Sequence, residues 1–168
     1  HGRANAADVK ALIEVAQRLK STVRDSDLIA RLGGDEFVVT LTQVAERAAM
    51  EKVAEKIQLV VSQPYELDGH QLHTTPSIGI SLFPRDGESV EALIRHADAA
   101  MYHAKAQGRD NWQFFSEQIR EASAERLRLE TGLRGALQRG EFLLHFQPQL
   151  DVAAGRIVAV EALLRWRH

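Results

Sequence analysis

Apolar residues recur three or four positions apart in four long stretches of the chain, which is the spacing of a helix with one buried face. The pattern predicts helices over about residues 8–23, 43–61, 90–107 and 117–139. Thr42 and Ser89 stand where a side chain would cap the second and third of these helices, and Gly108 stands just past the end of the third. Gly140 ends the fourth, a long charged helix that we interpret as a connector.

Shorter stretches between the helices have the composition of β-strands. Residues 28–42 predict a hairpin, with Gly33 and Gly34 as a pair suited to a tight turn whose central residues need φ > 0. Further strands are predicted over about residues 74–83, 111–115, 142–146 and 157–164. Helices and strands in this order predict an α+β fold, in which helices pack against a sheet.

The overall composition is that of an ordinary soluble globular protein, with 45% hydrophobic and 26% charged residues among 168. The formal net charge of −2 provides no basic field for a nucleic acid polymer, and the absence of cysteine excludes disulfides and thiolate metal sites. No apolar run approaches the roughly 20 residues of a membrane span, so we expect no direct membrane contact and a cytoplasmic location. The chain starts at His1 without Met; we interpret it as a piece of a longer protein and leave open an inner-membrane anchor upstream.

Two carboxylates, Asp35 and Glu36, follow the glycine pair directly. A hairpin turn needs the glycines, but it does not need two adjacent acids. Carboxylates at a turn offer oxygen ligands to Mg²⁺, which binds phosphates beside a few carboxylates, and the missing Cβ atoms of Gly33 and Gly34 let a flat ligand approach the backbone. From this local pattern alone, a hairpin without any catalytic role stays the alternative.

Residues 33–37 read Gly-Gly-Asp-Glu-Phe, the signature of the GGDEF family of diguanylate cyclases. Three more segments, residues 77–81, 97–105 and 108–111, are typical of that family and stand in its order and spacing. Residues 8–115 therefore resemble a GGDEF domain, which implies a nucleotidyl-cyclase-like sheet with a ferredoxin-like core. The resemblance also implies the condensation of two GTP molecules to cyclic di-GMP. Each of two facing domains holds one GTP in this family, so a homodimer is implied for catalysis.

The resemblance assigns roles to four side chains. Asp35 would hold the metal, Mg²⁺ or Mn²⁺, and lie near the attacking 3′-hydroxyl, and Glu36 would support it. Lys105 and Arg109 would contact the phosphates, and their spacing of four predicts that both cations lie on one helix face. The residues implied to bind GTP are Gly33, Gly34, Lys105 and Arg109. Without the family resemblance, the simpler interpretation is that Lys105 and Arg109 stabilise the C-terminus of a helix, which attracts cations.

Arg24 and Asp27 form an R-x-x-D pair, with five residues between Asp27 and Gly33. The resemblance makes this pair a product-inhibition site for cyclic di-GMP. An Arg pairs with a phosphate or stacks on a base, and an Asp accepts a hydrogen bond from a guanine edge. Without the family, a surface ion pair is the usual meaning of such a pattern.

The beginning of the chain departs from the family pattern, which opens with a strand that carries another metal-binding Asp and continues with an Asn that holds guanine. Neither feature is present. For the guanine-binding Asp, spacing from His1 indicates Asn5, whereas spacing back from the helix indicates Asp8 or Val9, and we name Asp8 as the candidate. Two alternatives stay open. Either the strand is absent and the domain is inactive, or it lies upstream and the parent is a full cyclase.

Residues 142–149 and 160–166 resemble the opening of an EAL domain, the phosphodiesterase that linearises cyclic di-GMP. The resemblance implies the first strands of a TIM-type barrel and makes Glu161, which begins a Glu-Ala-Leu motif with Leu163 as its third residue, a metal ligand at a strand end. Gln147 and Arg165 would contact the dinucleotide. On sequence alone, Glu161 is more simply an acid at a strand end in solvent. The remaining acids and the catalytic base of such a domain are not in this chain.

These observations predict three regions: a GGDEF domain without its first strand at 1–116, a connector helix at 117–140 and the start of an EAL domain at 141–168. Our first hypothesis is a diguanylate cyclase joined to a cyclic di-GMP phosphodiesterase, with GTP and cyclic di-GMP as partners. The alternative is a catalytically inactive GTP-binding GGDEF domain that regulates its EAL neighbour. A third is an interaction scaffold that dimerises through the connector helix, whose apolar stripe is narrow.

Overall fold

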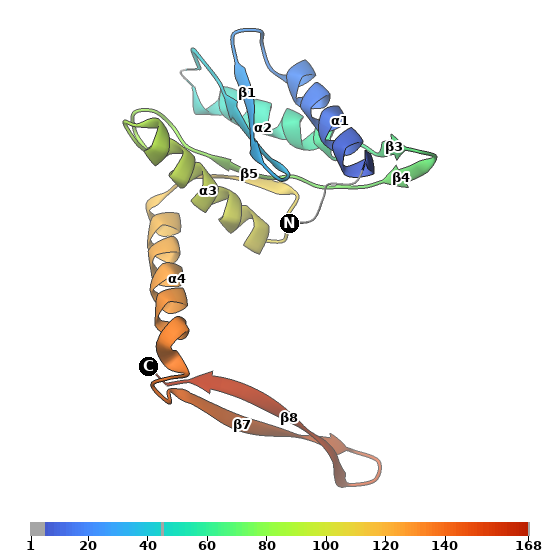
Figure 1. Cartoon of the computed structure of the whole chain (residues 1–168), viewed down its shortest axis with the longest axis vertical. Helices are drawn as coiled ribbons and strands as arrows, with labels where there is room; N and C mark the ends of the chain where they lie inside the picture. Colours follow the sequence, from blue (N-terminus) through green and yellow to red (C-terminus); the bar gives the residue numbers. More distant parts are fainter. Residues whose placement is uncertain (1–5, 45, 168) are drawn as a thin grey trace. The chain divides into compact units, whose positions relative to one another are not determined.

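The computed structural model describes residues 6–44 and 46–167. The chain forms two compact units, the first ending at Arg120 and the second beginning at Glu121 (Figure 1). The helices are α1 (Ala6–Thr22), α2 (Arg47–Val61), α3 (Val90–Ala106) and α4 (Glu117–Ala136). The strands are β1 (Leu28–Gly33), β2 (Glu36–Thr40), β3 (Tyr65–Leu67), β4 (His70–Leu72), β5 (Ser77–Ile80), β6 (Asn111–Phe114), β7 (Phe142–Asp151) and β8 (Arg156–Trp166). In the described parts of the chain, a membrane-spanning helix is not found.

The first unit contains three pairs of strands. β1 and β2 form an antiparallel hairpin, β3 and β4 form a second, and β5 and β6 pair in parallel. Helix α3 connects β5 to β6 and packs against both. Among the described residues, no strand is hydrogen-bonded between these pairs, so each is a separate two-stranded sheet.

Gly79 allows α3 to lie close to β5. A Cβ atom at this position would stand 1.8 Å from the carbonyl oxygen of Ala97 and 2.3 Å from the backbone nitrogen of Met101. Because both atoms belong to the backbone of α3, a side chain at residue 79 would push the helix away from the strand. The small residue in the middle of β5 therefore sets the distance between the two elements.

The main core of the first unit lies where α1 meets α2. Leu19 of α1 and Ile57 and Val61 of α2 are buried together. Partly buried residues from α1, α2, the β1–β2 hairpin and β5 pack against this cluster: Val15, Ile29, Phe37, Val39, Val53 and Ile78. A second cluster joins α3 to the chain that leaves β6, through Ala100, Phe115 and Ile119.

Leu19 of α1 and Ile57 of α2, both predicted to face inward, thus meet a core. Val9 and Ile13 of the predicted α1 face are instead exposed. In α3, the cluster uses Ala99 and Ala100, which lie outside the predicted inward face.

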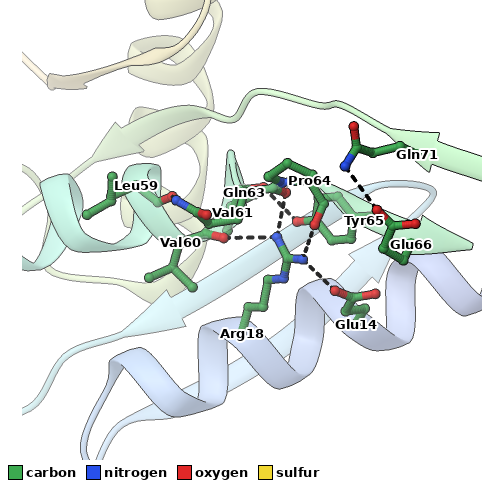
Figure 2. Close-up of polar contacts among 10 residues, drawn as sticks. All are labelled: Glu14, Arg18, Leu59, Val60, Val61, Gln63, Pro64, Tyr65, Glu66 and Gln71. Atoms are coloured by element: carbon green, nitrogen blue, oxygen red, sulfur yellow. Dashed lines mark hydrogen bonds and ion pairs between the residues drawn. The ribbon is translucent and has the colours of Figure 1, made fainter.

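Arg18 ties α1 to the end of α2 (Figure 2). Its guanidinium donates hydrogen bonds to the carbonyl oxygens of Val60 at 3.1 Å, Gln63 at 2.6 Å and Pro64 at 2.6 Å. It also pairs with the Glu14 carboxylate and lies 3.7 Å from the centroid of the Tyr65 ring. These contacts fix the C-terminal end of α2 on α1.

The second unit consists of most of α4 and the β7–β8 hairpin, which pairs Phe142 with Trp166 and Asp151 with Arg156 at its two ends. The Trp166 indole N–H donates to the Glu141 carboxylate at 2.9 Å. Gly132 of α4 makes room for the ring, because a Cβ there would stand 2.6 Å from Trp166. This unit therefore carries its own contact between helix and hairpin.

The start of α2 differs from the prediction. The helix begins at Arg47 instead of residue 43, and the N-cap is Glu46, whose side chain makes no capping bond. Thr42 was predicted as the cap, and this is wrong, because its backbone N–H and hydroxyl bond to Asp27 instead. Gln43 then takes φ +55°, which turns the chain away from a helical path.

Other boundaries agree or shift by a few residues. Ser89 caps α3 as predicted, and its hydroxyl accepts the Ala92 N–H at 3.1 Å. Helix α4 ends at Ala136, before the predicted residue 139, and Gly140 follows with φ +66°. β5 is shorter than predicted, whereas β7 and β8 are longer.

Candidate active site

The turn of the β1–β2 hairpin carries the two acids of the predicted site. Its two loop residues are Gly34 and Asp35, one position later than the predicted pair, because a bulge at Leu32 shifts the register so that Gly33 pairs with Glu36. Gly34 takes φ +53°, a conformation that L side chains rarely adopt. Asp35 therefore lies in the turn itself and not at the start of the second strand.

The surroundings of this turn are open. Asp35 and Glu36 are exposed, and a Cβ atom added at Gly33 or Gly34 would meet nothing within 4 Å. Over residues 6–44 and 46–167, neither carboxylate has a hydrogen bond or ion pair. A ligand can thus reach both the backbone and the acids from solvent.

Arg31 holds the shape of the turn. Its guanidinium donates two hydrogen bonds to the Gly34 carbonyl oxygen, from Nε at 3.0 Å and from Nη2 at 2.7 Å. The peptide between Gly34 and Asp35 is therefore fixed by a side chain of the preceding strand. Arg31 could not be predicted from the sequence, because its partner is a backbone oxygen and no local pattern marks it.

Lys105 and Arg109 lie at the C-terminal end of α3. Lys105 is half-buried in the last turn, and Arg109 is exposed. The prediction that both cations share one helix face is wrong, because α3 ends at Ala106 and Arg109 has φ +62°, outside the helix. In Figure 1 this end of α3 and the turn of the β1–β2 hairpin lie toward the same end of the first unit.

Asp27 organises the predicted inhibition site. Its carboxylate accepts the backbone N–H of Thr42 at 3.0 Å and that of Arg24 at 3.0 Å. These hydrogen bonds, first from Thr42 and then from Arg24, hold the pKa of the Asp27 carboxyl below its ordinary value. Arg24 is exposed, and the hydrogen bond that joins the pair uses the Arg24 backbone, while the charge of Arg24 also contributes to the lowered pKa of Asp27.

The candidates near the beginning of the chain are only partly described. Asp8 lies in the first turn of α1 and is exposed, and so is Val9. His1 and Asn5 lie outside the described residues. Asp8 therefore stays a prediction for the guanine-binding position.

The described residues bring together no group of three or more His, Cys, Asp or Glu side chains that would hold a metal ion by themselves. The donor set at the turn still fits Mg²⁺, because this ion is usually held by one or two carboxylates together with substrate phosphates and water. Asp35 and Glu36 are open carboxylates of that kind.

Four residues of the second unit share one face of the β7–β8 hairpin. The register pairs Gln147 with Glu161 and places Leu163 and Arg165 two and four residues further along β8. Side chains two residues apart in a strand, and those of directly paired residues, point to the same side of the sheet. The structure therefore brings together the predicted EAL-type residues on one face of this hairpin.

The comparisons with known proteins define the class. The family model of the diguanylate cyclase GGDEF domain matches residues 5–125, so the chain belongs to the GGDEF family. The model of the EAL domain matches residues 130–168, so the start of an EAL domain follows. The predicted order of the two domains is confirmed, although the barrel is not visible in this short segment.

Two curated relatives from Pseudomonas aeruginosa match most of this chain. The bifunctional diguanylate cyclase/cyclic di-GMP phosphodiesterase MucR is 47% identical over 94% of this chain and 23% of its own length. The cyclic di-GMP phosphodiesterase NbdA is 41% identical over 92% of this chain and 20% of its own length. The chain thus spans less than a quarter of the length of these relatives.

A solved structure supports the predicted fold. The GGDEF domain of TpbB (YfiN) from Pseudomonas aeruginosa aligns with a TM-score of 0.67 at 36% identity and covers 71% of this chain and 70% of that chain. The α+β prediction with a GGDEF-type architecture is therefore confirmed.

Proposed function

We propose that the first unit condenses two GTP molecules to cyclic di-GMP, in a protein whose EAL domain hydrolyses this product. The observation that carries the proposal is the turn between β1 and β2. Asp35 lies in the loop, next to two glycines that leave space for a nucleotide, and Arg31 holds the loop in shape. The family match and the names of the relatives support the same substrate and product.

In this proposal, each residue has a separate task. Asp35, supported by Glu36, would hold Mg²⁺ or Mn²⁺, which neutralises phosphate charge when bound. Gly33 and Gly34 admit the nucleotide, and Lys105 and Arg109 bind its phosphates as cations. Each domain holds one GTP, so that two copies must face each other for synthesis.

We also propose that cyclic di-GMP binds at Arg24 and Asp27 and inhibits synthesis. The exposed Arg24 guanidinium is open to a phosphate or a base. Asp27 keeps the segment in shape through Thr42, which follows the strand leaving the turn. This bond gives the inhibition site a direct connection to the hairpin that carries Asp35.

A second candidate is a GTP-binding domain that does not react and instead regulates the EAL neighbour. The observation that favours it is the small number of acids at the turn: the described residues supply Asp35 and Glu36 there and no cluster of three metal-ligating side chains. In this alternative, the two carboxylates hold Mg²⁺ together with the bound nucleotide, and no further acid activates the attacking hydroxyl.

The deciding experiment uses the full-length protein with Glu161→Ala, which blocks degradation in this proposal. GTP and Mg²⁺ are added, and the nucleotides are separated by chromatography. Formation of cyclic di-GMP by the Glu161→Ala protein, and no formation when Asp35→Ala is also present, supports the cyclase. GTP that binds without being converted supports the regulatory alternative. Arg24→Ala is expected to relieve inhibition by added cyclic di-GMP, and unchanged inhibition would refute the second site.

A further inference from the structure

The chain that leaves α3 has an unusual backbone. Gly108, Arg109 and Asp110 follow one another with φ of +112°, +62° and +48°. Glycine adopts such angles freely, but Arg and Asp carry a Cβ that disfavours them, and Arg disfavours them more than Asp. The surrounding structure must therefore hold Arg109 and Asp110 in this conformation.

The last two turns of α2 provide one hold. The Gln58 side-chain amide donates to the Asp110 carbonyl oxygen at 2.6 Å and to its carboxylate at 3.2 Å. The hydroxyl of Ser62, the residue that ends this helix, donates to the same carboxylate oxygen at 3.2 Å. Both residues are about fifty positions away from Asp110 in the sequence. We call this set of three hydrogen bonds the Asp110 clamp.

Further hydrogen bonds that fix this backbone come from α3 and β6. The Arg109 backbone N–H donates to the Ala104 carbonyl at 3.3 Å. The Asn111 side-chain amide donates to the carbonyl oxygens of Ala104 at 2.9 Å and Arg109 at 2.8 Å. The backbone on both sides of Arg109 is thus tied, although its guanidinium has no hydrogen bond or ion pair in the described part of the chain.

The end of α2 that carries the clamp is itself held in place. Arg18 of α1 binds the carbonyl oxygens of Val60, Gln63 and Pro64 around Ser62 (Figure 2). The backbone carbonyl groups of this short segment therefore bind α1 through Arg18, and its Gln58 and Ser62 side chains bind Asp110. A displacement of this segment would move the backbone beside Arg109.

We propose that Gln58 and Ser62 are positioning residues for Arg109. The Asp110 clamp keeps Arg109 in the left-handed conformation. This conformation sets the direction in which the Arg109 side chain leaves the backbone, although the Arg109 side chain makes none of the clamp contacts. The proposal rests on the proposed function, in which Arg109 binds the phosphates of GTP. It adds two residues of α2 that would make this binding strong without contacting the nucleotide.

The test measures the binding of 3′-deoxy-GTP, which lacks the attacking hydroxyl and is not converted. Calorimetry with the full-length protein compares it with GMP, which lacks the terminal phosphates. Gln58→Met together with Ser62→Ala removes both donor groups of the clamp, and with them its three hydrogen bonds, at similar side-chain size. We expect about tenfold weaker binding of 3′-deoxy-GTP, the effect of one weakened charge-assisted contact, and little change for GMP. Gln63→Met is the matched control at the same helix end.

Two further variants separate positioning from stability. Asp110→Asn keeps an acceptor and suits φ > 0, so it should bind 3′-deoxy-GTP like the unchanged protein. Asp110→Ala keeps only the bond from Gln58 to the backbone carbonyl, so its binding should be weaker than that of the unchanged protein and no weaker than that of the double variant. With Arg109→Ala already present, loss of the clamp should cause no further weakening. Equal weakening with and without Arg109, or equal loss of GMP binding, would show a structural role alone and overturn the proposal.

The outcome is independent of catalysis. If 3′-deoxy-GTP binds and depends on the clamp while no cyclic di-GMP is formed from GTP, the proposed cyclase function fails and the clamp stands. If the unchanged protein does not bind 3′-deoxy-GTP at all, the positioning role is refuted together with the substrate assignment.

Discussion

At the scale of single residues, Arg18 supplies hydrogen-bond donors to carbonyl groups at the end of α2. The last carbonyl groups of a helix have no partner within the helix, and a cation nearby is favourable. Arg18 reaches from α1 to the Val60 carbonyl of α2 and to the two carbonyls that follow the helix, while 16% of its side chain remains exposed. The planar guanidinium bonds several acceptors at once, which an ammonium cannot do in the same geometry.

We predict that Arg18→Ala destabilises the first unit by about 2 kcal/mol, because the partly buried carbonyl oxygen of Val60 loses its donor and the buried Tyr65 ring loses the guanidinium packed on it. Arg18→Lys should recover only part of this loss. The measurement is urea unfolding followed by circular dichroism. Lys20→Ala on the same helix is the control, since Lys20 is exposed and should change the free energy of unfolding little. Equal effects at both positions would contradict the role given to Arg18.

Asp27 makes the contact between the Arg24–Asp27 segment and Thr42 depend on pH. Its pKa is lowered in the folded protein by the backbone N–H groups of Thr42 and Arg24, so the folded state favours the charged carboxylate. The stabilisation is therefore present above 3.8, its ordinary value, and is lost as the pH falls through the lower folded-state pKa. We expect the NMR shift of the Thr42 amide proton to titrate with a midpoint below 3.8. Asp27→Asn should abolish this titration, and a midpoint above 3.8 would contradict the predicted direction of the pKa shift.

At the scale of elements, the sequence pattern predicted the helices and part of their buried faces. Leu19 of α1 and Ile57 of α2 meet a core, and Ser89 caps α3, because spacing and capping act within a few residues. Val9 and Ile13 of the predicted α1 face stay exposed, because spacing does not determine which apolar positions find a packing partner. The start of α2 was wrong because Thr42 bonds to Asp27, fifteen positions earlier in the chain. A contact between distant residues overrode a local preference, and the sequence gives no signal for it.

The candidate site shows the same limit. Asp35 and Glu36 could be named as candidates because they stand in the family signature, and because two adjacent acids are not needed for a turn. The bulge that moves Asp35 into the loop depends on strand register, and the left-handed conformation of Arg109 depends on the Asp110 clamp. Arg31 was missed for a related reason, since it acts on a backbone oxygen.

Gly79 tests the packing of α3 on β5. We predict that Gly79→Ala destabilises the first unit by about 3 kcal/mol or more, because its Cβ would overlap the α3 backbone at Ala97, which has no flexible end to move. Gly87→Ala is the comparison, since its Cβ would stand 3.0 Å from the Ala92 side chain. Thermal unfolding should show a much larger fall in midpoint for Gly79→Ala. Similar midpoints would mean that α3 shifts away from β5 without cost.

At the scale of the whole molecule, the two units differ in how much they bury. Among the described residues, the buried hydrophobic side chains lie in the first unit with the exception of Ala136. The β7–β8 hairpin exposes large apolar side chains instead, and these include Phe146, Leu150 and Leu164. Since burial of apolar surface is the main stabilising term, we expect the second unit of this chain to be the less stable one.

Each unit contains one tryptophan, so the two can be followed separately. Trp112 lies in β6, edge to face with Phe114, and Trp166 lies in β8, against Gly132. In the 168-residue chain, we predict that the fluorescence of Trp166, read in a Trp112→Phe variant, changes at lower urea than that of Trp112 in a Trp166→Phe variant.

A core substitution then shows whether the two transitions are separate. Ile57→Ala removes a buried side chain from the first unit and should cost about 2–5 kcal/mol there. The midpoint seen by Trp112 should fall while that seen by Trp166 stays, because Ile57 belongs to a core that the second unit does not share. Coincident midpoints that move together would instead mean that the GGDEF unit and the start of the EAL domain unfold as one cooperative body.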